Sequence, residues 1–135
     1  MASAFQLSIV APDRKVVETQ VSSVTAPGTE GYLGVMAGHI PMIVSLKPGL
    51  LEYRDMNSQE HYVAIDGGFM EINATSVIVL AEGAKLSGDI DLKAAEAELE
   101  EARRALRGES SSMSTEEATE HMERALARIK AARLR

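Results

Sequence analysis

Hydrophobic residues change their spacing along the chain. Up to about residue 87, short runs rich in Val, Ile and Leu are broken by Gly, Pro, Asn and Asp roughly every 8–12 residues. Phe5, Leu7 and Ile9 alternate with polar or small residues, so one side of that segment is expected to face a core. This pattern is typical of an antiparallel β-sandwich. The strands it predicts cover residues 5–10, 16–17, 21–27, 31–35, 42–46, 49–54, 61–66, 69–73 and 76–80.

Turn-forming residues lie between several of these runs. Pro12 and Asp13 form a turn pair after the first strand. Residues 47–49, Lys-Pro-Gly, are expected to reverse the chain, and residues 66–68, Asp-Gly-Gly, are expected to separate one strand from the next.

Residues after 87 have helical spacing. Asp91 suits an N-cap, and Ser114 with Glu117 forms an S-x-x-E capping box for a second helix. Gly108 and the serines at 110–112 are expected to end the first helix and link it to the second. The apolar or small stripes are Leu92, Ala95, Leu99, Ala102 and Leu106, then Ala118, Met122, Ala125, Leu126, Ile129 and Ala132.

The fold class expected is therefore an all-β N-terminal sandwich over residues 1–87 followed by a C-terminal α-helical hairpin over residues 88–135. Alanine dominates the helical stripes, and each Ala at a buried site forgoes about 2–5 kcal/mol relative to Leu. The hairpin should thus be weakly held. It is either a mobile arm that acts as a switch or a short bundle that covers the sandwich, and the residues alone favour the bundle.

Charge and amino-acid composition exclude several classes of function. The net charge is −6, which argues against a nucleic-acid or anionic-lipid binder. The absence of cysteine excludes disulfides, iron–sulfur clusters and thiolate zinc sites. No targeting signal and no apolar run of about 20 residues are found, so any membrane association should pass through a protein partner. The segment from residue 124 onward is basic and has no acid, with Arg124, Arg128, Lys130, Arg133 and Arg135.

Catalytic motifs are absent from the sequence. His39, His61 and His121 lie in no metal-binding spacing, and no nucleophile elbow or phosphate-binding glycine loop occurs. We therefore expect no catalytic and no metal site. Two alternatives stay open at this point: a free-standing β-sandwich adaptor for protein interactions, and a cupin-like metal enzyme that uses His39 and His61.

Residues 28–41 contain four glycines within eleven positions, which indicates tight bends and a binding edge at Tyr32 and Met36. This segment resembles the epsilon subunit of F-type ATP synthases, whose pattern is G-x-x-G-x-L-G-[IV]-x-x-G-H-x-P-[LM] followed by [KR]-P-G. Two further markers are similar, at residues 67–72 (with Asp66 in place of the usual Ser) and at residues 77–81, before Ile90-Asp91. The matches to the first pattern are Gly28, Gly31, Leu33, Gly34, Val35, Gly38, His39, Pro41 and Met42, then Lys47, Pro48 and Gly49.

The resemblance implies a non-catalytic central-stalk subunit that couples proton-driven rotation to ATP synthesis. It would lie peripherally on the cytoplasmic side of the bacterial cell membrane, bound to the gamma subunit and the c ring. The ring-facing edge corresponds to residues 30–39, with Glu30, Tyr32, Gly38 and His39, although many relatives have a carboxylate at the position of Tyr32.

The resemblance also implies that the hairpin can extend into the catalytic head and inhibit ATP hydrolysis. Its basic residues would then meet acidic loops of the alpha and beta subunits. The hairpin residues assigned to this interface are Arg124, Arg128 and Arg133.

Some relatives bind ATP on the folded hairpin as a regulatory ligand, and no cofactor is otherwise required. The matching residues are Asp91, Arg124 and Arg128, but Ala94 stands where those relatives have an arginine. Because that change removes a multi-donor group, ATP binding is expected to be weak or absent. From the residues alone, Arg124 and Arg128 are solvated helix charges.

Overall fold

A computed structural model of the chain describes residues 3–109 and 112–134. Ser110, Ser111 and Arg135, which were assigned to the serine link and the basic end, lie outside the described residues.

The N-terminal part is a sheet that closes on itself. The strands follow the order β1-β6-β5-β4-β2-β3, and β1 also pairs with β2, which closes five strands into a ring and leaves β3 on the outer edge of β2. The β1–β6 pairing is parallel and the others are antiparallel. The sandwich prediction is confirmed. The strands are β1 Phe5–Ala11, β2 Arg14–Gly28, β3 Gly31–Val35, β4 Met42–Asp55, β5 Glu60–Ile72, β6 Ser76–Ala81 and β7 Ala84–Leu86.

Three pairs of short predicted strands are single long strands, β2, β4 and β5. The chain reversal predicted at residues 47–49 is wrong, because β4 and β5 stay paired in one register from Met42 opposite Ile72 to Arg54 opposite Glu60. The break predicted at residues 66–68 is wrong for a related reason. The φ angles of Gly67 and Gly68 are 104° and 139°, so β5 can change direction there without leaving the ladder.

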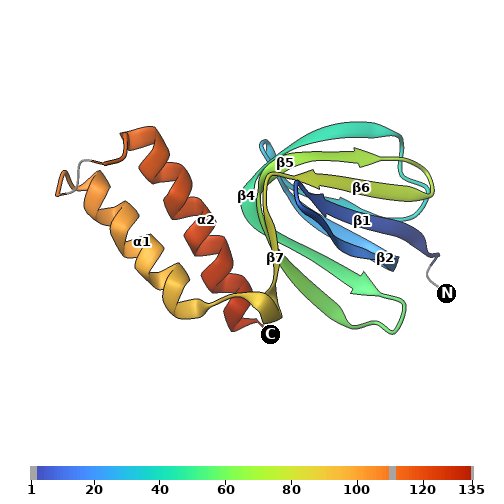
Figure 1. Cartoon of the computed structure of the whole chain (residues 1–135). Helices are drawn as coiled ribbons and strands as arrows, with labels where there is room; N and C mark the ends of the chain where they lie inside the picture. The colour runs from blue at the N-terminus through green and yellow to red at the C-terminus, as the bar shows by residue number, and fades with distance from the viewer. Residues whose placement is uncertain (1–2, 110–111, 135) are drawn as a thin grey trace.

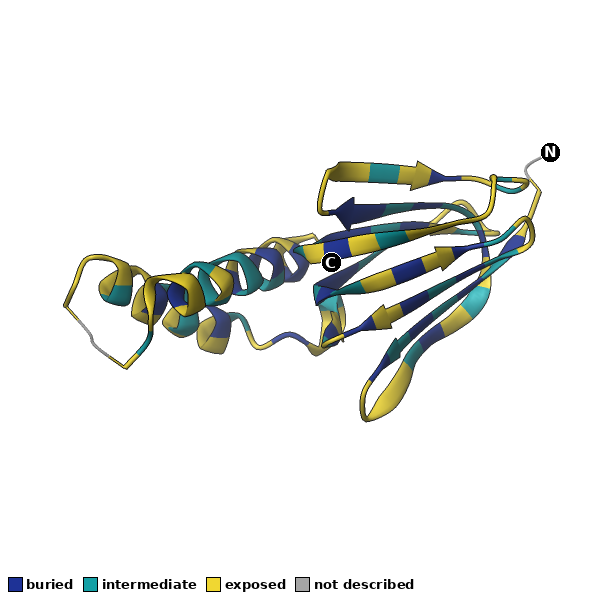
Figure 2. Cartoon of the chain, turned by 90° about the horizontal axis from the view of Figure 1, so that it is seen from above, coloured by how far each residue is buried: buried dark blue, intermediate teal, exposed yellow. Residues whose placement is uncertain are grey.

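The sandwich core follows the alternation seen in the sequence. Phe5, Leu7 and Ile9 are all buried, and Leu51 on β4 joins the same cluster. Leu50, next to it, points to the opposite face and packs under the helices. Figure 2 shows this change between buried and exposed residues along the strands.

Both predicted helices form with their predicted caps. A 3-10 turn, η1 Ser87–Asp89, leads into α1 Leu92–Leu106, and α2 is Thr115–Arg133. The Asp91 carboxylate accepts a hydrogen bond from the Ala94 N–H at 3.1 Å, and the Ser114 hydroxyl accepts one from the Glu117 N–H at 3.1 Å. Gly108 ends α1 with a φ of 79°.

Helix α2 lies between α1 and the sandwich, as Figure 1 shows, and packs on β4 and β5. Of the predicted α2 stripe, Ala118, Ala125, Ile129 and Ala132 are buried, but Leu126 is 43% exposed. A second buried face, with Ala127 and Ala131, packs against Leu50 and Ala64 and was missed. Two alanines give too weak a hydrophobic signal to mark a face in the sequence.

Candidate functional site

The loop after β3 presents apolar side chains to solvent. Met36 is 66% exposed and Ile40 is 77% exposed. Gly38 has a φ of 80°, and its N–H donates to the carbonyl of Ala74 in the β5–β6 turn at 3.1 Å. The Nδ1 atom of His39 lies 2.9 Å from the Ile40 carbonyl oxygen, within the same loop. The loop is therefore anchored to the sandwich while its tip stays free to contact a partner.

The four residues assigned to a ring-facing edge lie in two places. Gly38 and His39 follow the end of β3 at Val35, whereas Glu30 precedes its start and Tyr32 is its second residue. A five-residue strand is about 16 Å long, so the two pairs lie at opposite ends of β3. Tyr32 is 57% exposed and also lines a groove under α2.

The outer face of β4, β5 and β6 has an apolar patch that the sequence analysis did not single out. Ile43 is 74% exposed, Phe69 is 58% exposed and Leu80 is 56% exposed. Phe69 lies directly opposite Leu80 on β6 and opposite Ser45 on β4. Ile43 is two residues from Ser45 along β4, so it points to the same face. The sequence does carry a signal for this patch, which is the unbroken apolar run at residues 77–80. A strand with one face in solvent should instead alternate between apolar and polar residues. Contiguous exposed apolar surface indicates an interaction site.

Arg128 on α2 joins three elements. Its Nη2 donates to Oδ2 of Asp66 on β5 at 2.9 Å, and its Nη1 donates to Oε2 of Glu98 on α1 at 3.0 Å. The side chains of Arg128 and Asp66 are 20% and 13% exposed. Arg128 is thus no solvated helix charge, because its planar fork binds two carboxylates at once. Asp66 and Glu98 were missed as its partners, since no sequence spacing links residues on a strand and two helices.

Residues assigned to an ATP site are only partly brought together. Asp91 and Arg128 line one cavity of about 260 Å³ with Lys85, Ala94 and Glu98, and Arg124 is not among its lining residues. Two cationic and two anionic side chains face this cavity, so it has no excess of positive charge for phosphate.

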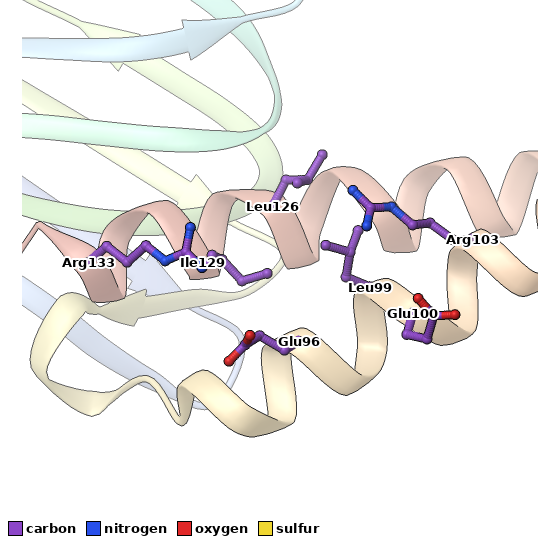
Figure 3. Close-up of a pocket in the computed structure, with 7 residues that line it drawn as sticks. All are labelled: Glu96, Leu99, Glu100, Arg103, Leu126, Ile129 and Arg133. Atoms are coloured by element: carbon purple, nitrogen blue, oxygen red, sulfur yellow. The ribbon is translucent and has the colours of Figure 1, made fainter.

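A groove that is open to solvent runs along the two helices. A cavity of about 430 Å³ lies between α1 and α2, and Figure 3 shows Leu99 on α1 reaching toward α2 beside it. Arg133, the third basic residue of the predicted head-facing interface, lines this cavity and is exposed. Most of the residues that line it are exposed, so this groove is part of the surface of the hairpin. Its other lining residues are Glu96, Glu100, Arg103, Leu126 and Ile129.

The histidines do not form a metal centre. His61 Nε2 lies 2.8 Å from Asp55 Oδ2, and the His61 ring stacks on Tyr53 with centroids 4.8 Å apart. The hydrogen bond with His61, followed by one from the Gln59 N–H, lowers the pKa of Asp55. Burial, followed by the nearby Asp55 charge, raises the pKa of the Tyr53 hydroxyl. These contacts hold the β4–β5 turn together.

Among residues 3–109 and 112–134, no group of three or more His, Asp or Glu side chains is arranged to hold a metal ion. In the same part of the chain, no helix is both long and apolar enough to span a bilayer.

A closed β-sandwich with exposed apolar surfaces, joined to a helical hairpin, defines the class of small interaction modules of larger assemblies. The chain belongs to the ATP synthase delta/epsilon chain family. Residues 4–87 match the model described as "ATP synthase, Delta/Epsilon chain, beta-sandwich domain", and residues 89–133 match "ATP synthase, Delta/Epsilon chain, long alpha-helix domain". The family resemblance seen in the sequence is confirmed, and with it the assignment to a non-catalytic subunit.

Similar proteins of known identity support the same family. The chain is 38% identical over 130 residues to the ATP synthase epsilon chain of Moorella thermoacetica, covering 96% of this chain and 97% of that protein. It is 36% identical over 129 residues to the epsilon chain of Syntrophomonas wolfei, covering 96% and 94%.

Solved structures share the fold. A chain of the Euglena gracilis mitochondrial ATP synthase gives a TM-score of 0.77 at 24% identity, covering 100% of this chain and 84% of that chain. A chain of the Tetrahymena thermophila mitochondrial ATP synthase central stalk and c ring gives 0.62 at 16% identity, covering 96% and 97%.

Proposed function

We propose that this chain couples proton-driven rotation to ATP synthesis as a central-stalk subunit, and that its hairpin inhibits ATP hydrolysis. The observation that carries the proposal is the family match over both the sandwich and the helices. The subunit would lie on the cytoplasmic side of the bacterial cell membrane, held there through the complex.

The two exposed apolar surfaces of the sandwich suit two partners. We assign the patch of Ile43, Phe69 and Leu80 to the gamma subunit, because these side chains lie on one face of neighbouring paired strands and form contiguous apolar surface. We assign the loop with Gly38 and His39 to the c ring, because its tip projects Met36 from an anchored base.

Substitutions at these surfaces distinguish the two assignments. Phe69→Ser should weaken binding to gamma, and Gly38→Val should weaken binding to the ring. A side chain at Gly38 meets no atom within 4 Å, so the harm comes from the φ of 80°, which valine disfavours. Arg14→Ser, at the exposed start of β2, is the control. Undiminished binding of Gly38→Val to the ring would count against this use of the loop.

The hairpin is docked on the sandwich here, and we infer that a released form meets the head. Arg124 and Arg133 lie outside the bridge that Arg128 makes, so they suit contacts with acidic loops of the alpha and beta subunits. Arg128 suits such a contact only after it leaves Asp66.

ATP binding by Asp91, Arg124 and Arg128 stays a prediction, with weak affinity expected. The balanced charges of the cavity near Asp91 support that expectation. Calorimetric titration of the isolated chain with MgATP tests it, and tight stoichiometric binding would contradict it.

Purification of the tagged chain from membranes tests the main proposal. Gamma, alpha, beta and c subunits should co-purify with it. A free-standing adaptor would appear without them.

A further inference from the structure

The bridge of Asp66, Arg128 and Glu98 connects the sandwich to both helices of the hairpin. Asp66 and Arg128 are 62 positions apart in sequence. In the part of the chain that the structure describes, theirs is the one ion pair that joins sandwich and hairpin. The pairing of Arg128 with Glu98 is internal to the hairpin.

An apolar contact lies beside this bridge. Helix α2 contributes Ala127, Ala131 and Ala132 to it, opposite Leu50 and Ala64 of the sandwich, and Ile90, Leu92 and Tyr62 complete it. On the α2 side each alanine buries a single methyl group. A mostly buried, charge-assisted hydrogen bond therefore adds to what holds the hairpin on the sandwich.

The sandwich holds the Asp66 carboxylate in place. The Asp66 N–H donates to the Gly83 carbonyl at 2.8 Å, and a Cβ at position 83 would overlap the Asp66 carboxylate. The β6–β7 turn therefore needs glycine to leave room for an aspartate aimed at Arg128.

We propose that the pair of Asp66 and Arg128 is a latch that sets the balance between docked and released hairpin. Lifting the hairpin breaks this pair and keeps Arg128 bound to Glu98, so one ion pair distinguishes the two states. The effect of the latch on ATP hydrolysis rests on the proposed function. The latch itself is a property of the isolated chain.

Distances between spin labels in the isolated full-length chain test the latch. The chain has no cysteine, so labels can be placed at exposed Glu71 on β5 and exposed Glu116 on α2. Asp66→Asn keeps the size of the side chain and removes its charge. It should raise the ratio of released to docked hairpin about 5- to 30-fold. The matched control is Glu82→Gln. It removes an acid that lines a cavity of about 410 Å³ together with Asp66 and Arg128 but forms no ion pair with Arg128.

Two more variants separate the latch from a general loss of fold. Gly83→Ala keeps Asp66 but displaces its carboxylate, and should release the hairpin as well. Glu98→Gln should loosen α1 from α2 while α2 stays docked. Thermal melts must show a folded sandwich in each variant. The latch is overturned if Asp66→Asn and Gly83→Ala leave the distances unchanged, or if Glu82→Gln changes them as much.

These distances need no other synthase subunit. A failed latch therefore leaves the proposed function standing. A chain that latches but never joins a rotor would contradict the proposed function alone.

Discussion

Leu50→Ala removes a buried leucine side chain that the sandwich offers to the hairpin. Leu50 is 2% exposed and lies in the cluster under α2 with Ala127 and Ala131. It is not part of the sandwich core, which Leu51 enters from the other face of β4. The substitution should therefore weaken hairpin docking while the sandwich keeps its stability.

The size of the effect follows from the atoms removed. Leucine has three more carbon atoms than alanine, and each buried one contributes about 0.8 kcal/mol, so the loss is about 2.4 kcal/mol. A cavity left behind raises the cost of such a change toward 5 kcal/mol in a rigid core. Helix α2 can shift onto the sandwich, so we expect the lower value. It corresponds to roughly a 50-fold weaker docking equilibrium.

Hydrogen exchange measured by mass spectrometry tests this in the isolated chain. Peptides from α2 should exchange faster in Leu50→Ala, whereas peptides from β1 and β6 should be unchanged. Leu51→Ala is the control, because its side chain is fully buried in the main core. It should speed exchange throughout the sandwich. The reasoning is refuted if Leu50→Ala leaves α2 protected, or if it destabilises the sandwich as much as Leu51→Ala does.

Three further substitutions test individual contacts. Gly68→Ala should cost about 1–3 kcal/mol or more in urea unfolding, since its φ is 139° and a Cβ would overlap the Leu80 carbonyl; Gly34→Ala, which meets no neighbour, should stay within about 0.5 kcal/mol. Asp55→Asn should remove a pH dependence of thermal stability. The pKa of Asp55 in the folded state is below 3.8, so its contribution to stability is present above that pH and is lost as the pH falls through the folded-state pKa. If thermal stability fell equally in acid with and without the substitution, this would be contradicted. Ser114→Ala should reduce helical circular dichroism and cost about 0.5–2 kcal/mol, and an unchanged melt would exclude the cap as a contributor.

Local patterns predicted the fold class and the helix ends well. Alternation at Phe5, Leu7 and Ile9 reports burial directly, and caps such as Asp91 and Ser114 act within three residues. These features depend only on neighbours in sequence.

Features that depend on distant residues were not predictable in the same way. Proline and glycine at Pro48 and Gly67 bend paired strands instead of ending them, because the ladder between β4 and β5 continues on both sides. The second buried face of α2 consists of alanines, which fit a buried or an exposed position equally well. The partners of Arg128 come from a strand and another helix, so only the folded chain brings the three together.

The central claim is that a sandwich bound to the rotor carries a hairpin that restrains hydrolysis when it is released toward the head. ATP hydrolysis by the reconstituted complex, with the full chain or with a chain lacking residues 88–135, tests it most directly. We predict faster hydrolysis with the shortened chain and unchanged co-assembly with gamma. Equal hydrolysis rates in two complexes of equal composition would contradict the inhibitory role of the hairpin.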